Sequence, residues 1–127
     1  MIHVPVSNGE LIDKYTILHI KQEFIDDKDK LKKVEDEINV LKTFVKELIH
    51  QYNIEELMNK LKNTNKELWN IEDNIRLKEK AQLFDKEFIE LARSVYFTND
   101  KRAEIKNIIN EKTNSSIFEV KSYEKYD

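Results

Sequence analysis

The chain has 127 residues, of which 39% are hydrophobic, and it carries a formal net charge of −3 with one Gly, one Pro and no Cys. A chain of this length fits one domain, and so little Gly and Pro favours an all-α fold, because strands and turns use these residues more often. The absence of Cys excludes disulfides and thiolate metal sites, and the negative charge provides no general attraction for nucleic acid.

No apolar run approaches the roughly 20 residues that a membrane-spanning helix needs. The N-terminus also lacks the basic and apolar segments of a secretion signal. We therefore expect a soluble, cytoplasmic protein that binds neither membrane nor nucleic acid.

The first residues predict an extended arm followed by a strong helix start. Residues 2–6 alternate apolar and other side chains, and Pro5 restricts such an arm to a sheet edge. Ser7 is a good N-cap, and Glu10 three positions later completes the pattern of a capping box. Gly9 falls in the first helical turn, where it lets another segment approach the backbone closely.

Apolar residues then recur every seven positions, as in the seam of a coiled coil. The seam residues are Ile17, Phe24, Leu31, Ile38 and Val45 at one position, and Ile20, Val34, Leu41 and Leu48 at the other. Only Asp27 interrupts this pattern, which predicts a single helix from Ser7 to Leu48. A second stripe, Leu11, Leu18 and Ile25, widens the apolar face in the first half of that helix, which we expect to contact more than one neighbour.

A second helix is predicted from Ile54 to Gln82, with Asn53 as its N-cap. Because the connection is short, the two long helices are expected to pair as an antiparallel coiled-coil hairpin. In that register Asp27 would face Arg76.

Two shorter helices are predicted to follow and to pack against the N-terminal half of the first helix. Asp85 caps the third, which runs to about Val95. After a bend at residues 96–100, Thr98 or Asn99 caps the fourth.

Residues 117–123 have strand character and could pair with the arm at residues 2–6, although two short strands are marginal without other support. We therefore predict one helical domain with two parts. The head comprises residues 1–25 and 83–127, and the stalk hairpin comprises residues 26–82.

Two stretches near the ends of the chain carry a resemblance. They are residues 5–21, PVSNGELIDKYTILHIK, and residues 91–102, LARSVYFTNDKR, with residues 119–123 after the second. Together they resemble the two signatures of a family of small uncharacterised helical proteins found in bacteria and their viruses. That family is a domain of unknown function, so the resemblance implies a shared fold and no activity, and no catalytic residue is carried over.

The candidate binding site lies in these same stretches. Glu10 and Asp13 occupy seam positions that are apolar further along, so both carboxylates should point inward, which is costly without cationic partners. The candidate partners are Arg93, Lys101 and Arg102, with Lys14, Tyr96 and Asn99 completing a polar network. A structural ion-pair cluster is the plainer interpretation. The alternative is a phosphate or carboxylate pocket formed by Arg93, Arg102 and the N-terminus of the fourth helix.

No metal site or cofactor is predicted, because His3, His19 and His50 have no ligand spacing to one another and no glycine loop could hold a phosphate. Three large apolar residues, Phe44, Met58 and Trp69, lie off the predicted seams. A thin hairpin would leave them exposed, which predicts a homodimer through the stalk.

Two classes of function remain open, and the sequence favours the first. The first is a non-enzymatic oligomerisation or adaptor protein, which assembles through its stalk and recruits a protein partner through its head. The second is a small-anion-binding protein or an enzyme that uses the polar pocket of the head. A helical mutase of the chorismate type would be one form of the second, on fold-level analogy alone; no catalytic residue is assigned.

Overall fold

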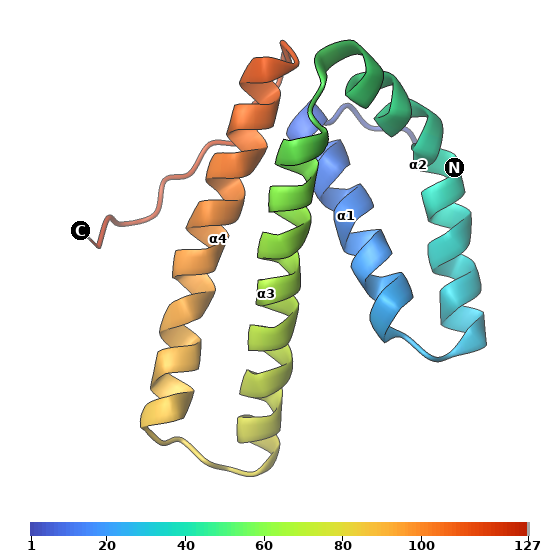
Figure 1. Ribbon diagram of the computed structural model, residues 1–127. Helices are drawn as coiled ribbons and strands as arrows, with labels where there is room; N and C mark the ends of the chain where they lie inside the picture. The colour runs from blue at the N-terminus through green and yellow to red at the C-terminus, as the bar shows by residue number, and fades with distance from the viewer. Residues whose placement is uncertain (127) are drawn as a thin grey trace.

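The computed structural model describes residues 1–126, which form four helices (Figure 1). They are α1 (Asn8–Phe24), α2 (Lys28–Tyr52), α3 (Glu55–Lys80) and α4 (Lys86–Lys112). The predicted all-α class is confirmed, since the described residues contain no strand. None of these helices combines the length and apolar character needed to cross a membrane.

The prediction of a single helix from Ser7 to Leu48 is wrong, because the chain turns between α1 and α2. Ile25 and Asp27 both have extended backbones, with φ and ψ of −91° and 130° and of −64° and 120°. The Asp27 carboxylate accepts a hydrogen bond from the backbone N–H of Lys30 at 3.0 Å and so caps α2. The one interruption of the seam therefore marks a helix start.

The central helix is α1, which packs against α2 on one side and against α3 and α4 on the other (Figure 1). The predicted coiled-coil hairpin between the second and third of these helices does not form along their length. They diverge from a short connection at Asn53, and α1 lies between them. Arg76 accordingly pairs with Glu72, one turn away at 3.5 Å, and not with Asp27.

The core consists of two apolar clusters that share α1. The larger joins all four helices and contains Ile12, Val45, Ile54, Leu61, Ile105 and Ile109. The smaller joins Leu18 of α1 to Val34 and Ile38 of α2. The seam of α2 therefore buries Val34 and Ile38 against α1, and it buries Val45 in the larger cluster. The expectation that the N-terminal helix contacts more than one neighbour is confirmed.

One helix, α4, replaces the two shorter helices predicted after residue 85. Asp85 caps it as expected, accepting from the backbone N–H of Phe88 at 2.9 Å. Residues 96–100 continue the helix, so the predicted bend and the caps at Thr98 and Asn99 are wrong. The segment has no Gly or Pro that would end a helix, and Thr98 is buried within it.

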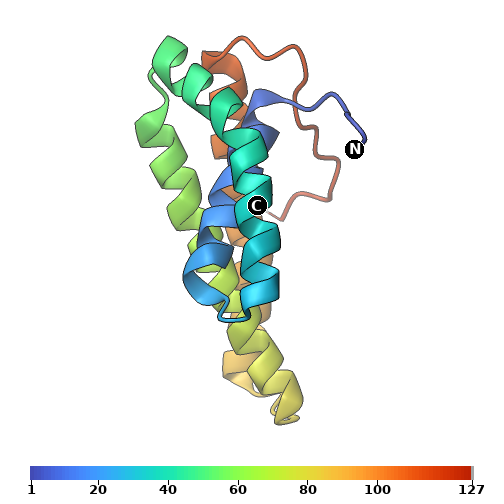
Figure 2. The same ribbon diagram turned by 90° about the vertical axis from the view of Figure 1, so that its right-hand side faces the viewer.

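The described residues of the two terminal segments form neither helix nor strand, so the predicted strand pairing between residues 2–6 and 117–123 is wrong. Both segments lie on the same side of the helices (Figure 2). The Asn107 side chain donates to the backbone carbonyl of Glu119 at 3.2 Å and accepts from its N–H at 3.3 Å. A side chain of α4 therefore supplies the hydrogen bonds that a partner strand would have made.

Candidate functional site

The start of α1 lies unusually close to α4 because residue 9 is glycine. A Cβ at Gly9 would lie 2.4 Å from the backbone oxygen of Lys106 and 2.9 Å from Oδ1 of Asn110. The N–H of Gly9 donates to that Asn110 oxygen at 2.6 Å, and the N–H of Asn8 donates to Oγ of Ser115 at 3.1 Å. Side chains in the last turn of α4 and just beyond it thus accept from N–H groups that a helix N-terminus leaves free.

Only half of the predicted capping box forms. Oγ of Ser7 accepts from the backbone N–H of Glu10 at 3.0 Å, as expected. The Glu10 carboxylate does not complete the box; it pairs with Nζ of Lys106 at 2.7 Å. The Glu10 carboxylate therefore binds the Lys106 ammonium of α4 instead of the backbone N–H of Ser7.

Asp13 is the centre of the site and is 1% exposed. Its Oδ1 accepts from Nε of Arg102 at 2.9 Å and from Nδ2 of Asn65 at 2.8 Å, while its Oδ2 accepts from Nη2 of Arg102. This two-pronged geometry is the strongest form of an arginine–carboxylate pair. The hydrogen bonds to both oxygens offset the cost of burying the carboxylate.

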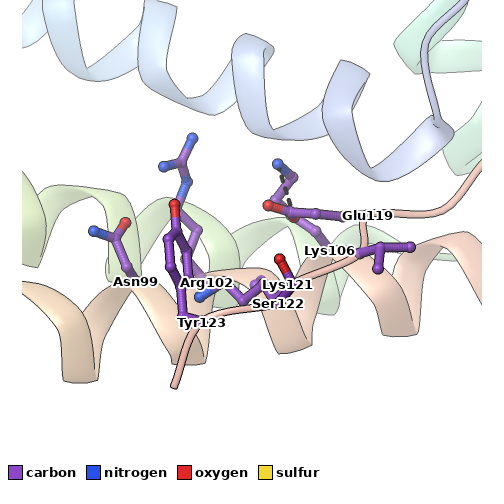
Figure 3. Close-up of a pocket in the computed structure, with 9 residues that line it drawn as sticks. Asn99, Arg102, Lys106, Glu119, Lys121, Ser122 and Tyr123 are labelled. Carbon is purple, nitrogen blue, oxygen red and sulfur yellow. Dashed lines mark ion pairs between the residues drawn. The ribbon is translucent and has the colours of Figure 1, made fainter. Parts of the chain in front are cut away.

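Lys106 is the second buried charge, with only 4% of its surface exposed. Besides Glu10, its Nζ lies 3.2 Å from Oε2 of Glu119 and 3.9 Å from Oδ2 of Asp13 (Figure 3). Burial by itself would lower the pKa of Lys106, but these three carboxylates outweigh it and raise the pKa. The pKa of Arg102 is also raised, chiefly by its hydrogen bond to Asp13.

We call these five residues, Glu10, Asp13, Arg102, Lys106 and Glu119, the Asp13 network. Its three carboxylates exceed its two cations, so the network has no uncompensated positive charge. An anion that entered would have to displace an existing carboxylate partner. The geometry therefore fits a device that fastens α1 and the C-terminal segment to α4.

A pocket of about 380 Å³ lies between α4 and the C-terminal segment, beside the Asp13 network (Figure 3). Its polar lining comes from Asn99, Arg102, Lys106, Glu119, Lys121, Ser122 and Tyr123. The third cation, Lys121, pairs with Asp100 at 2.7 Å. Each cation of this pocket therefore already has a carboxylate partner.

A second hollow of about 570 Å³ lies between α1, α3 and α4. Its apolar lining comes from Ile17, Ile20, Leu68 and Trp69, and the Trp69 ring stacks on Phe24 at 5.7 Å between centroids. Arg102 lines this hollow as well as the pocket. The Arg102 side chain thus borders both cavities, and its hydrogen bonds to Asp13 hold it in place.

Of the predicted site residues, Glu10, Asp13 and Arg102 meet in the network, and Asn99 lines both hollows. Lys14 and Lys101 lie elsewhere. Lys14 forms an ion pair with Glu37 of α2 at 2.8 Å, and Lys101 lies 3.8 Å from Glu67 of α3.

Arg93 and Tyr96 are also outside the network. The guanidinium of Arg93 lies over the ring of Phe97, 5.9 Å from its centroid, and the Tyr96 ring packs against Tyr126. Because α4 is one continuous helix, Arg93 lies more than two turns from Arg102 and cannot reach the same carboxylate.

Sequence reasoning missed four residues of the site: Lys106, Glu119, Asn65 and Asn110. A signal for two of them was present, because polar residues recur every three or four positions along α4. This stripe is Asn99, Arg102, Lys106, Asn110 and Thr113. Such spacing places the side chains on one helix face, and a polar stripe beside buried isoleucines indicates a polar partner helix. Asn65 carried no comparable signal.

The fold and the site define an all-α protein with two helical hairpins, α1–α2 and α3–α4. A buried ion-pair network fastens the two hairpins together. The chain belongs to DUF6165, a family of unknown function that matches residues 2–126. No curated protein and no solved structure matches the chain. The family brings no activity, substrate or partner, so the function is unknown on comparison alone.

Proposed function

We propose that this protein is a non-enzymatic helical assembly module that forms a homodimer and presents the dimer to a protein partner. The observation that carries the proposal is its exposed area of 9200 Å². A compact monomer of 15.3 kDa exposes about 7,100 Å². The excess of roughly 2,000 Å² is larger than the roughly 800 Å² that each partner buries in a standard interface.

Large apolar side chains form part of this exposed surface, and they lie in three regions. The first is the end of the α3–α4 hairpin, the second is the outer face of α2, and the third is the pair of terminal segments. Representative residues are Leu77, Leu83, Phe84 and Ile89; Val40 and Phe44; and Ile2, Val4, Val120 and Tyr123. Apolar surface gathered in this way favours contact with another protein over solvent.

The three interface candidates from the sequence contribute unequally. Phe44 is 57% exposed on α2 and is free to contact another chain. Met58 packs against the larger apolar cluster, and Trp69 stacks on Phe24. Phe44 therefore represents one candidate surface for the dimer, on α2, while the other two have contacts within the chain.

The paired charges of the Asp13 network support a structural role for the polar residues. A general acid, a general base or an anion receptor needs a group that is free to exchange partners, whereas Asp13 and Lys106 are buried and held by several neighbours. Under this proposal, the network sets the angle between the hairpins and thereby shapes the surface for assembly.

Light scattering coupled to size-exclusion chromatography tests the proposal. At micromolar concentration we expect twice the chain mass of 15.3 kDa, with dissociation on dilution. A mass of one chain at every accessible concentration would contradict homodimer formation.

A second candidate function is the binding of a small anion in the pocket beside the network. The observation that favours it is that Arg102, Lys106 and Lys121 all line this pocket. Thermal unfolding with and without phosphate tests it, because a ligand of the native state raises the unfolding midpoint. Under the assembly proposal we expect no specific rise relative to chloride at equal ionic strength.

A further inference from the structure

The hollow between α1, α3 and α4 has the size and the apolar walls of a small-molecule site. Its volume of about 570 Å³ lies within the range of roughly 300–1,000 Å³ that is usual for ligand pockets. Ile17 and Ile20 of α1 form one apolar wall, and Leu68 and Trp69 of α3 form another. Such walls hold the body of a ligand, and a few polar groups select its edge. The polar groups of this hollow therefore decide what it can bind.

Asn65 of α3 is the most buried of these polar groups, with 5% of its surface exposed. Its Nδ2 donates to Oδ1 of Asp13 at 2.8 Å and to Oγ1 of Thr16 at 3.0 Å, so both of its N–H bonds are used. No described residue donates to Oδ1 of Asn65. This oxygen is nevertheless not sealed in the core, because among the described residues only Glu119 has a sealed side-chain oxygen or nitrogen without a hydrogen bond. Oδ1 is therefore reached through the hollow that Asn65 lines.

Two further polar groups border the hollow from α4. Asn99 and Arg102 are three positions apart, so they lie on the same face of this helix. The side-chain amide of Asn99 makes no hydrogen bond with any of residues 1–126. Arg102 donates to Asp13 through Nε and Nη2, and its Nη1 makes no hydrogen bond within the same range. The hollow thus offers an acceptor on Asn65, a donor on Arg102 and both on Asn99.

The charges around the hollow disfavour an anionic ligand. The guanidinium of Arg102 is paired with Asp13, and that of Arg76 lies 3.5 Å from Glu72. Asp73, which also lines the hollow, has no ion pair with another described residue. A carboxylate or phosphate would therefore meet the charge of Asp73 and find no unpaired cation, whereas an uncharged ligand avoids this repulsion.

We propose that this hollow binds an uncharged aromatic ring that carries a carboxamide. A carboxamide presents an N–H donor beside a carbonyl acceptor, which matches Oδ1 of Asn65 and Nη1 of Arg102, and the Asn99 amide can make a further bond to either group. The ring lies against Leu68 and Trp69, because aromatic pairs gain energy beyond the burial of their area. All of these residues belong to one chain, so the site does not depend on the proposed homodimer.

Titration with benzamide, followed by NMR, tests the site. The chain has one Trp, so the indole N–H of Trp69 gives a single signal from the wall of the hollow. Benzamide should shift this signal saturably in the low-millimolar range. N,N-Dimethylbenzamide, which has no N–H donor, and benzoate, which is an anion, should each bind at least tenfold more weakly. The absence of a saturable shift with benzamide would overturn the site, and equal affinity for either analogue would overturn recognition of an uncharged carboxamide.

A pair of asparagine variants locates the bound benzamide. Asn99→Ala removes no hydrogen bond within the described chain and introduces a better helix former, so the variant should fold, as circular dichroism would show. It should raise the benzamide dissociation constant at least fivefold. Asn70→Ala, beside Trp69 but on the exposed face of α3, removes an amide that does not line the hollow and should leave the constant within about twofold. Equal dissociation constants for the parent and Asn99→Ala would show that benzamide binds elsewhere and would contradict the proposed site.

Discussion

Gly9 is the residue at which the smallest chemical change should have the largest structural effect. In Gly9→Ala the added methyl group would meet the Lys106 backbone oxygen, which cannot move without displacing α4. We expect a loss of about 1–3 kcal/mol in the free energy of unfolding, as for other overpacked sites. Urea denaturation measures it. Lys14→Ala, on the exposed side of the same helix, is the control, and equal midpoints for the two variants would argue against close packing at Gly9.

The ion pair between Asp13 and Arg102 decides between a structural and a binding role. Arg102→Ala would leave the buried Asp13 carboxylate without its main partner, so we expect a loss of about 3–5 kcal/mol. The adjacent Lys101→Ala, which removes only a surface ion pair, should cost at most about 1 kcal/mol. If Arg102→Ala were as stable as the parent and only the parent were stabilised by phosphate, the anion pocket would be the better interpretation.

At the scale of the helices, the turn between α1 and α2 depends on a local capping interaction. Asp27→Ala removes the acceptor for the N–H of Lys30 and should destabilise the protein by about 1 kcal/mol, whereas Asp27→Asn should have a much smaller effect. Asp26→Ala removes the neighbouring negative charge and leaves the capping hydrogen bond in place. Chemical denaturation of the three variants gives the comparison, and a cost at Asp26 equal to that at Asp27 would refute the capping role.

For the whole molecule, surface ion pairs should make stability fall in acid. The hydrogen bonds from Lys66 and Lys62 lower the pKa of Glu23 to about 2, and those from Lys78 and Lys121 lower the pKa values of Asp85 and Asp100. As the pH falls below about 4.5, the unfolded chain therefore binds more protons than the native one. The stability that these ion pairs contribute is present above about pH 4.5 and is lost as the pH falls toward 2.

Denaturation between pH 6 and pH 2 measures this dependence. Glu23→Gln should flatten the decrease, while Glu47→Gln, on the exposed face of α2, should leave its slope unchanged. High salt should weaken the effect, because Glu23 is exposed and its ion pairs are screened. An identical slope in the parent and in Glu23→Gln would show that this carboxylate does not contribute.

The sequence by itself determined the features that depend on neighbours along the chain. The N-caps at Ser7 and Asp85 need only a side-chain oxygen and an N–H three residues later, and both are present. The all-α class follows from composition and from the helical spacing of apolar residues. Gly9 likewise predicted a close approach without identifying the segment that approaches.

Only the tertiary structure decided which helices pair and which charges meet. A heptad seam shows that a helix buries one face, but every apolar face offers a similar surface, so the seam of α2 could not specify α1 over α3. The same limit applied to the choice between Arg93 and Arg102, because a buried carboxylate pairs with whichever cation of the neighbouring helix lies beside it. The contact of Gly9 with α4, between residues about 100 positions apart in the chain, sets which part of α4 lies beside the carboxylate.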